Sequence, residues 1–188
     1  MKHRTLIIVA GLQGCGKSTL CDSLAKQFHC QVLHASKLFR ELNHLDEKTT
    51  GWWEKAGLKF IQQRSRNTKM DEQLDEIILS TIQEGNWVVD SWTMPCLSRE
   101  GIKVWLKASD EERSKRIAER DNISQKEALE KIRERMKNEQ RIYKKLYGFT
   151  FGEDLGPFHL VLDNTRLKPK ETLDIVHHAV NVLLKAKP

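Results

Sequence analysis

Residues 11–19 carry the residue types and the spacing that bind a phosphate group. The run Gly11-Leu12-Gln13-Gly14-Cys15-Gly16-Lys17-Ser18 matches the pattern G-x-x-x-x-G-K-[ST] at every fixed position, and Thr19 follows it. Glycines let backbone N–H groups wrap a phosphate, because a Cβ atom would block the dihedral angles and the close approach. Lys17 adds a positive charge for the outer phosphates, and the Ser18 hydroxyl suits Mg²⁺. We therefore expect residues 11–19 to bind the phosphates of a nucleotide.

A predicted strand and a predicted helix flank this loop, which is the context in which the motif is specific. Residues 5–10 form a continuous apolar run, typical of a strand that is buried on both faces. After the loop, Leu20, Leu24 and Phe28 recur at helical spacing, and residues 31–34 start a second strand. A strand–helix–strand unit of this kind is right-handed by default.

The rest of the chain continues as alternating strands and helices. Further strands are predicted over 87–90, 102–106 and 158–163, and a last helix over 170–184. Residues 36–84 show only helical spacing of apolar residues, which predicts three inserted helices. Ser109 and Ser124 each precede a glutamate by three residues, so each begins a helix with a capping box, and Gly148 ends the second of them. This order predicts an α/β fold: a five-stranded parallel sheet with helices on both faces.

Length and composition narrow the class of protein. The 188 residues fit one domain, 1–188, and a chain that is 39% hydrophobic and 31% charged is neither collagen-like nor disordered. Its apolar runs are too short to span a bilayer, so we expect a cytoplasmic protein without a membrane partner. The four cysteines lack metal-binding spacing and are expected to be reduced thiols. The net charge of +6 favours a polyanionic partner: nucleic acid, acidic lipid or a substrate with several phosphates.

The signatures that are absent from the sequence point to a small kinase. A signalling GTPase would need an Asp-x-x-Gly switch and an Asn-Lys-x-Asp guanine reader, and neither occurs. A motor or a helicase would need a far longer chain. A small kinase remains, in which the helical insertion holds the second substrate and a moving lid excludes water.

The run that follows the second predicted strand is His34-Ala-Ser36-Lys-Leu-Phe39-Arg40. In this run, and in the order of the motifs along nearly the whole chain, the sequence resembles the archaeal-type cytidylate kinases of the nucleoside monophosphate kinase family. The resemblance implies a P-loop kinase with its core at 1–35, 85–108 and 157–188, an NMP-binding insertion at 36–84 and a lid at 109–148. It also implies that Ser36 and Arg40 bind the acceptor, since a guanidinium fork holds two phosphate oxygens.

Within the insertion, Asp71 and Asp75 resemble the acidic residues that the family places beside the base. A carboxylate there can accept a hydrogen bond from an exocyclic amine such as that of cytosine, although a solvated helix face would show the same pattern. Trp52 and Trp53 could stack on a base or pack the insertion against the sheet. The two interpretations of the tryptophans stay open at this stage.

The lid region is rich in arginines at helical spacing. Arg113, Arg116 and Arg120 share one helix face, and Arg133, Arg135 and Arg141 follow on the next helix. The family brings lid arginines onto the transferring phosphoryl group. The resemblance therefore implies catalytic roles for Arg120 and Arg135, an ATP contact for Arg116 and an acceptor contact for Arg141. The interleaved glutamates imply that others are ordinary surface residues.

Two further segments follow predicted strands. Asp163-Asn-Thr165-Arg166 looks like the family's adenine loop, which implies ATP contacts for Thr165 and Arg166. After the third strand the family has an acidic residue, a glycine and an arginine that holds the monophosphate, but here the run is Asp90-Ser91-Trp92-Thr93. Asp90 keeps its place, as a catalytic residue and as a ligand that meets Mg²⁺ through water. Trp92 occupies the arginine's position on the acceptor side.

The leading hypothesis is therefore an ATP- and Mg²⁺-dependent kinase of a nucleoside monophosphate, CMP or dCMP, acting as a monomer. A first alternative is a kinase of a small-molecule hydroxyl, with Asp90 as the base. A second alternative is a nucleic-acid-associated ATPase, but the chain carries no recognised nucleic-acid-binding module. Arg40 discriminates between the first two, because an acceptor phosphate explains it and a neutral hydroxyl acceptor does not.

Overall fold

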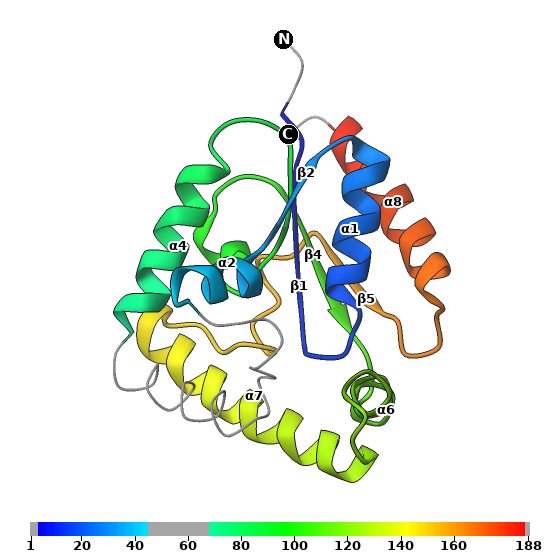
Figure 1. Cartoon of the computed structure of the whole chain (residues 1–188). Coiled ribbons are helices and arrows are strands. Elements are labelled where there is room, and N and C mark those ends of the chain that lie inside the picture. Colours follow the sequence, from blue (N-terminus) through cyan, green and yellow to red (C-terminus); the bar gives the residue numbers. More distant parts are fainter. Residues whose placement is uncertain (1–3, 45–67, 187–188) are drawn as a thin grey trace.

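The computed structural model describes residues 4–44 and 68–186, and Figure 1 shows their arrangement. Five parallel strands form one sheet in the order β2-β3-β1-β4-β5. Their bounds are Leu6–Gly11 for β1, Gln31–His34 for β2, Trp87–Asp90 for β3, Ile102–Lys107 for β4 and Leu160–Asp163 for β5. The predicted five-stranded parallel sheet is therefore confirmed.

The helices alternate with these strands. Their bounds are Lys17–Phe28 for α1, Ala35–Leu42 for α2, Lys69–Thr81 for α4, Met94–Leu97 for α5, Asp110–Asp121 for α6, Gln125–Tyr147 for α7 and Pro169–Lys185 for α8. The short α5 was not expected. The middle helix predicted in the insertion, with Trp52 and Trp53, lies outside the described residues. Within the described ranges, no helix is long and apolar enough to cross a membrane.

The central strand β1 explains why two cores form. All six of its residues are buried, and alternate side chains point to opposite faces of the sheet. Ile7 and Val9 pack with α1 and α8, whereas Leu6 and Ile8 pack with α2 and α4. A continuous apolar run is what a strand covered on both faces requires.

Helices α6 and α7 begin and end where the sequence predicted. The hydroxyl of Ser109 accepts a hydrogen bond from the Glu112 N–H and that of Ser124 accepts from the Glu127 N–H, each at 3.2 Å. Between the helices, Asn122 adopts φ 53°, which asparagine tolerates better than most residues, and Gly148 ends α7 with φ 75°. In Figure 1, α6 and α7 lie beyond the carboxyl end of β1, where parallel α/β sheets bind ligands.

Candidate active site

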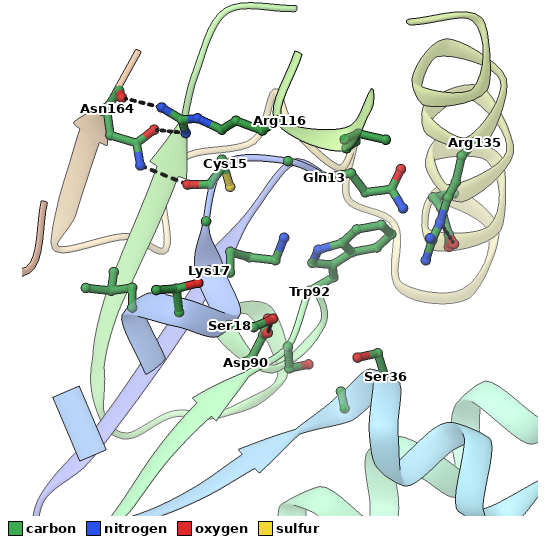
Figure 2. A pocket seen from close by; sticks show the side chains of 18 of the residues that line it. Gln13, Cys15, Lys17, Ser18, Ser36, Asp90, Trp92, Arg116, Arg135 and Asn164 are labelled. Atoms are coloured by element: carbon green, nitrogen blue, oxygen red, sulfur yellow. Dashed lines mark hydrogen bonds and ion pairs between the residues drawn. The ribbon is translucent and has the colours of Figure 1, made fainter. Parts of the chain in front are cut away.

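A cavity of about 700 Å³ lies at the carboxyl ends of the strands. Its walls come from the β1–α1 loop, the starts of α2 and α8, the inner faces of α4, α6 and α7, and the residues after β3 and β5. Figure 2 shows labelled side chains around this cavity from the β1–α1 loop, the start of α2, the end of β3, α6, α7 and the residues after β5. The volume is typical of a pocket that encloses a small-molecule ligand.

Packing requires two glycines of the phosphate loop, Gly11 and Gly14, to lack a side chain. A Cβ atom on Gly14, where φ is 77°, would lie 2.7 Å from the backbone oxygen of Arg113 on α6. A Cβ atom on Gly11 would lie 2.3 Å from the backbone oxygen of Leu106 in β4. Gly16 adopts φ 87° as the N-cap of α1. The loop is therefore fitted closely between β4 and the first lid helix.

Ser18 and Asp90 meet beneath this loop. The Ser18 hydroxyl donates to Asp90 Oδ2 at 2.8 Å. Behind Asp90, the buried His34 places one ring nitrogen 3.3 Å from Asp90 Oδ2 and the other 2.9 Å from Asp22 Oδ1. His34 was quoted in the sequence motif but given no role, because nothing in the sequence places β2 beside β3.

Charge and hydrogen bonds in this network keep Asp90 ionised. Burial would raise the pKa of Asp90, but the hydrogen bond from His34, the charge of Lys17 and the hydrogen bond from Ser18 outweigh it and lower that pKa. The hydrogen bond to Asp90 raises the pKa of His34. An ionised carboxylate beside a hydroxyl supplies the oxygen ligands that Mg²⁺ prefers. Within the described ranges, no group of three or more His, Cys, Asp or Glu side chains is placed to hold a metal.

Lys17, at the end of the phosphate loop, and Arg135, on α7, lie on two sides of the Trp92 ring. Lys17 Nζ donates to the backbone oxygen of Leu12 at 3.1 Å and lies 5.6 Å from the centre of the Trp92 ring. The Arg135 guanidinium carbon lies 5.0 Å from the same ring, and its Nε lies 3.4 Å from Glu139. With the Gln13 amide oriented so that its oxygen faces the guanidinium, that oxygen accepts from Arg135 Nε at 3.1 Å and also from Nη1. Arg135 therefore joins α7 to the phosphate loop.

The arginines of α6 divide into three environments. Arg113 is buried and donates to the backbone oxygen of Gln13 at 3.1 Å, a contact that sequence reasoning did not assign. Arg116 lines the cavity and donates to the backbone oxygen of Asn164 at 3.1 Å. Arg120 also lines the cavity, but its side chain is 63% exposed and pairs with Asp121.

At the wall formed by α2, α4 and the end of β3, Asp71 and Asp75 of α4 are buried and line the cavity, together with Ser36 and Trp92. Asp75 accepts a 2.6 Å hydrogen bond from the Thr93 hydroxyl and another from the hydroxyl of Tyr147 at the end of α7. Burial and this hydrogen bond raise the pKa of Tyr147 well above its usual range.

The structure does not place six of the predicted site residues on the cavity lining: Gly11, Leu12, Arg40, Arg141, Thr165 and Arg166. Gly11 packs against β4, and the Leu12 side chain joins an aromatic cluster. Arg40 is half-buried on α2. Arg141 is exposed, because six residues of helix turn it away from the face that carries Arg135.

The segment after β5 contributes different residues from those predicted. Arg166 is exposed, and the Thr165 hydroxyl is occupied by the Ser109 N–H at 2.9 Å and by Asp163. Instead Asn164, buried to 3% exposure, donates to the Cys15 backbone oxygen at 2.8 Å, and Thr172 of α8 lines the same wall. Sequence reasoning also missed Glu139 and Tyr143, although their spacing of four and eight residues from Arg135 indicates a shared helix face.

The sequence matches a known protein family and several named relatives. The model of the cytidylate kinase-like family matches residues 6–166. The cytidylate kinase of Sulfurisphaera tokodaii is 32% identical over 187 residues, covering 95% of this chain and 97% of the relative. The cytidylate kinase of Thermococcus kodakarensis is 30% identical over 179 residues, covering 95% of this chain and 89% of the relative.

Solved structures show the same fold at low identity. A shikimate kinase from Bacteroides thetaiotaomicron superposes with a TM-score of 0.61 at 13% identity, covering 94% of this chain and 98% of that one. A shikimate kinase from Acinetobacter baumannii superposes with a TM-score of 0.60 at 16% identity, covering 99% of this chain and 97% of that one. The predicted P-loop kinase fold is confirmed. From the family match and the near full-length relatives, the chain belongs to the cytidylate kinase-like family and is an enzyme of that kind.

Proposed function

We propose that this enzyme transfers the terminal phosphoryl group of ATP to CMP or dCMP, giving ADP and the nucleoside diphosphate. The observation that carries the proposal is that one cavity joins the phosphate loop, with Lys17 and Arg135 beside it, to the buried carboxylates of Asp71 and Asp75. The curated relatives are named cytidylate kinases, which supports the choice of base.

On the donor side, the backbone of residues 11–19 holds the ATP phosphates. Arg116 and Asn164 line the wall where we place the adenine. Thr165 supports that wall from outside the cavity through its hydrogen bond with the Ser109 N–H, and Arg166 is exposed beside it. Ser18 would hold Mg²⁺, with Asp90 meeting the ion through water, and the bound ion would neutralise charge on the phosphates. Lys17 is placed to bind the outer phosphates of ATP.

In the transfer step, the bond between the terminal phosphorus and its bridging oxygen breaks, and an oxygen of the CMP phosphate forms the new bond. That oxygen is already anionic, so no general base is required, and positioning together with cationic clamping lowers the barrier. Arg135 is a lid cation that lines the cavity and hydrogen-bonds to the Gln13 side chain of the loop, and Arg120 lies at the rim, from which lid closure would bring it inward.

On the acceptor side, Asp71 and Asp75 are suited to accept from the cytosine amine, and Ser36 lies at the same wall. Arg40 does not line the cavity here, and we propose that it reaches the CMP phosphate only after α2 closes on the site. Closure of α7 would not bring in Arg141, because Arg141 lies on a different face of this helix from Arg135.

A kinase of a hydroxyl acceptor is the second candidate, and one observation favours it. Among the described lining residues the cations are Lys17, Arg116, Arg120, Arg135 and Lys168, and none comes from α2, α4 or the end of β3. However, the lowered pKa of Asp90 makes this carboxylate a weak base, which counts against the role that the second candidate needs.

The deciding experiment is an ADP-release assay with ATP and Mg²⁺ against CMP, dCMP, UMP, AMP and GMP, beside a control without acceptor. We expect turnover with the cytidine nucleotides well above the control and above UMP. Turnover with none of the five, together with intact ATP binding, would contradict the proposed acceptor and favour a hydroxyl. Repeating the assay with EDTA tests the metal requirement.

A further inference from the structure

Trp92 lies between Lys17 of the phosphate loop and Arg135 of α7. It follows β3 directly, its side chain is half-buried, and its ring centre is 5.6 Å from Lys17 Nζ and 5.0 Å from the Arg135 guanidinium carbon. Figure 2 shows the indole in the middle of the site, with Lys17 on one side and Arg135 on the other. Both distances fall within the range in which an aromatic face attracts a cation.

The indole ring is itself held in place by other aromatic residues. Its ring centre lies 4.6 Å from that of Phe151 and 6.3 Å from that of Tyr143, which meets it edge-on. Tyr143 is buried on the same face of α7 that carries Arg135. Trp92 is therefore a fixed surface rather than a side chain that is free to swing into solvent.

Lys17 and Arg135 carry like charges that repel each other. Glu139 and Gln13 hold Arg135, whereas Lys17 donates to the backbone oxygen of Leu12. The electron-rich face of an indole attracts both of them without taking up a proton or adding a charge. Neither attraction blocks the nitrogen atoms that would bind phosphate, because those atoms keep their hydrogen-bond donors. The ring thus offsets part of the cost of holding Lys17 and Arg135 together before a nucleotide binds.

We propose that Trp92 is a positioning residue that holds Lys17 and Arg135 ready for the terminal phosphate of the donor nucleotide. The inference rests on the proposed function for the identity of the donor, ATP. It assigns Trp92 to the donor's terminal phosphate, not to direct contact with the acceptor. Loss of the ring should therefore weaken the recognition of a triphosphate more than that of a diphosphate.

The test uses Trp92→Leu, which keeps apolar bulk without an aromatic face, and Trp92→Phe, which keeps a weaker one. Trp105→Phe is the matched control, because Trp105 is in the same aromatic cluster, 5.5 Å from Phe151, but lies in β4 away from the cavity lining. Affinities for a non-hydrolysable ATP analogue and for ADP, both with Mg²⁺, are measured by calorimetry. Steady-state kinetics with CMP supply kcat and the acceptor KM.

We expect Trp92→Leu to weaken binding of the ATP analogue about tenfold and to change ADP affinity by less than about twofold, with a lower kcat. The affinity of Trp92→Phe for the ATP analogue should fall between those of Trp92→Leu and the wild type. Trp105→Phe should leave the affinities for the ATP analogue and for ADP unchanged. If Trp92→Leu does not fold, Trp92→Phe alone carries the comparison, because a smaller change in the ratio is still expected.

Two results would overturn the proposal. A raised acceptor KM with unchanged affinity for the ATP analogue would make Trp92 an acceptor contact. Equal losses of ATP-analogue and ADP affinity, repeated in Trp105→Phe, would make its role one of packing. A wild-type enzyme that is inactive with CMP would contradict the proposed function but leave this test intact, since both affinities are measured without an acceptor.

Discussion

Among the described residues, Lys17 Nζ donates to the backbone oxygen of Leu12 and faces the Trp92 ring, and phosphate oxygens could replace these contacts when a nucleotide binds. We expect Lys17→Ala to lower kcat by at least about 10²-fold, because its charge acts where negative charge spreads in the transition state. The measurement is steady-state ADP release with saturating ATP and CMP. Lys26→Ala is the control, since Lys26 is exposed on the same helix. A Lys17→Ala enzyme that kept most of its activity would contradict the phosphate-loop assignment.

The phosphate loop itself could be predicted from the sequence, because its function depends on residues that are adjacent in the chain. The residues that meet it from elsewhere could not. Arg113 and Arg116 differ by three positions on one helix, yet Arg113 is buried against Gln13 and Arg116 reaches Asn164. That difference depends on how α6 packs on the loop, and periodicity does not record the packing. The same holds for His34, whose role appears only when β2 pairs with β3.

Gly14 shows how the loop and the first lid helix depend on each other. Its φ of 77° and the 2.7 Å approach of the Arg113 oxygen to an added Cβ atom both exclude a side chain. We expect Gly14→Ala to reduce the free energy of unfolding by about 1–3 kcal/mol and to weaken ATP binding, because the backbone must shift. Urea unfolding measures the first effect. Gly156→Ala is the control, since nothing lies within 4 Å of a Cβ atom there. Equal stability of the two variants would refute the close packing.

At the scale of elements, the sequence predicted the long helices and strands of the described residues. It missed the short helix and the strand boundary that depend on tertiary contacts. The strands follow from apolar runs, and the break between α6 and α7 follows from Asn122 and the serine caps. The four residues of α5 carry no periodicity that could reveal a helix. Phe158 was predicted to begin β5, but its N–H bonds to the Leu155 oxygen in a turn and its ring packs on Trp105, so the strand starts at Leu160.

The hydrogen bond between Tyr147 and Asp75 joins the end of α7 to α4. Burial and Asp75 raise the pKa of Tyr147, so this phenol should stay protonated at a pH where an ordinary tyrosine, with a pKa of about 10, ionises. Because the pKa of Tyr147 is higher in the folded than in the unfolded protein, its protonated form adds to the free energy of unfolding. This contribution is complete below the pKa of the unfolded state and is lost as the pH rises through the pKa of the folded state.

Phenolate absorbance during a pH titration measures this directly, because the chain has only two tyrosines. We expect Asp75→Asn to lower the pKa of Tyr147, since the carboxylate charge is removed, and Tyr147→Phe to assign the signal. An unchanged titration curve in Asp75→Asn would show that α7 and α4 are not joined at this point.

For the whole molecule, the cavity walls come from α1, α2, α4, α6, α7 and α8 and from residues after β1, β3 and β5, so a bound nucleotide would contact elements that are far apart in the sequence. A ligand that binds only the folded state stabilises it by about 2.7 kcal/mol at a hundred times its Kd. We expect Mg²⁺-ATP and CMP each to raise the melting temperature, and CMP to do so more than UMP. UMP presents a carbonyl oxygen where CMP presents an amine, and this oxygen would face the carboxylates of Asp71 and Asp75.

The two halves of the cavity should therefore respond separately to substitution. Asp71→Asn replaces a carboxylate oxygen by an amide that can also donate, so it should narrow the difference between CMP and UMP while leaving the shift with Mg²⁺-ATP unchanged. Thermal unfolding with each nucleotide alone provides the measurement, and Glu76→Gln, a carboxylate of α4 outside the cavity lining, is the matched control. If Asp71→Asn kept the full preference for CMP, base selection would not depend on this carboxylate. If it weakened ATP instead, the assignment of the two halves would be reversed.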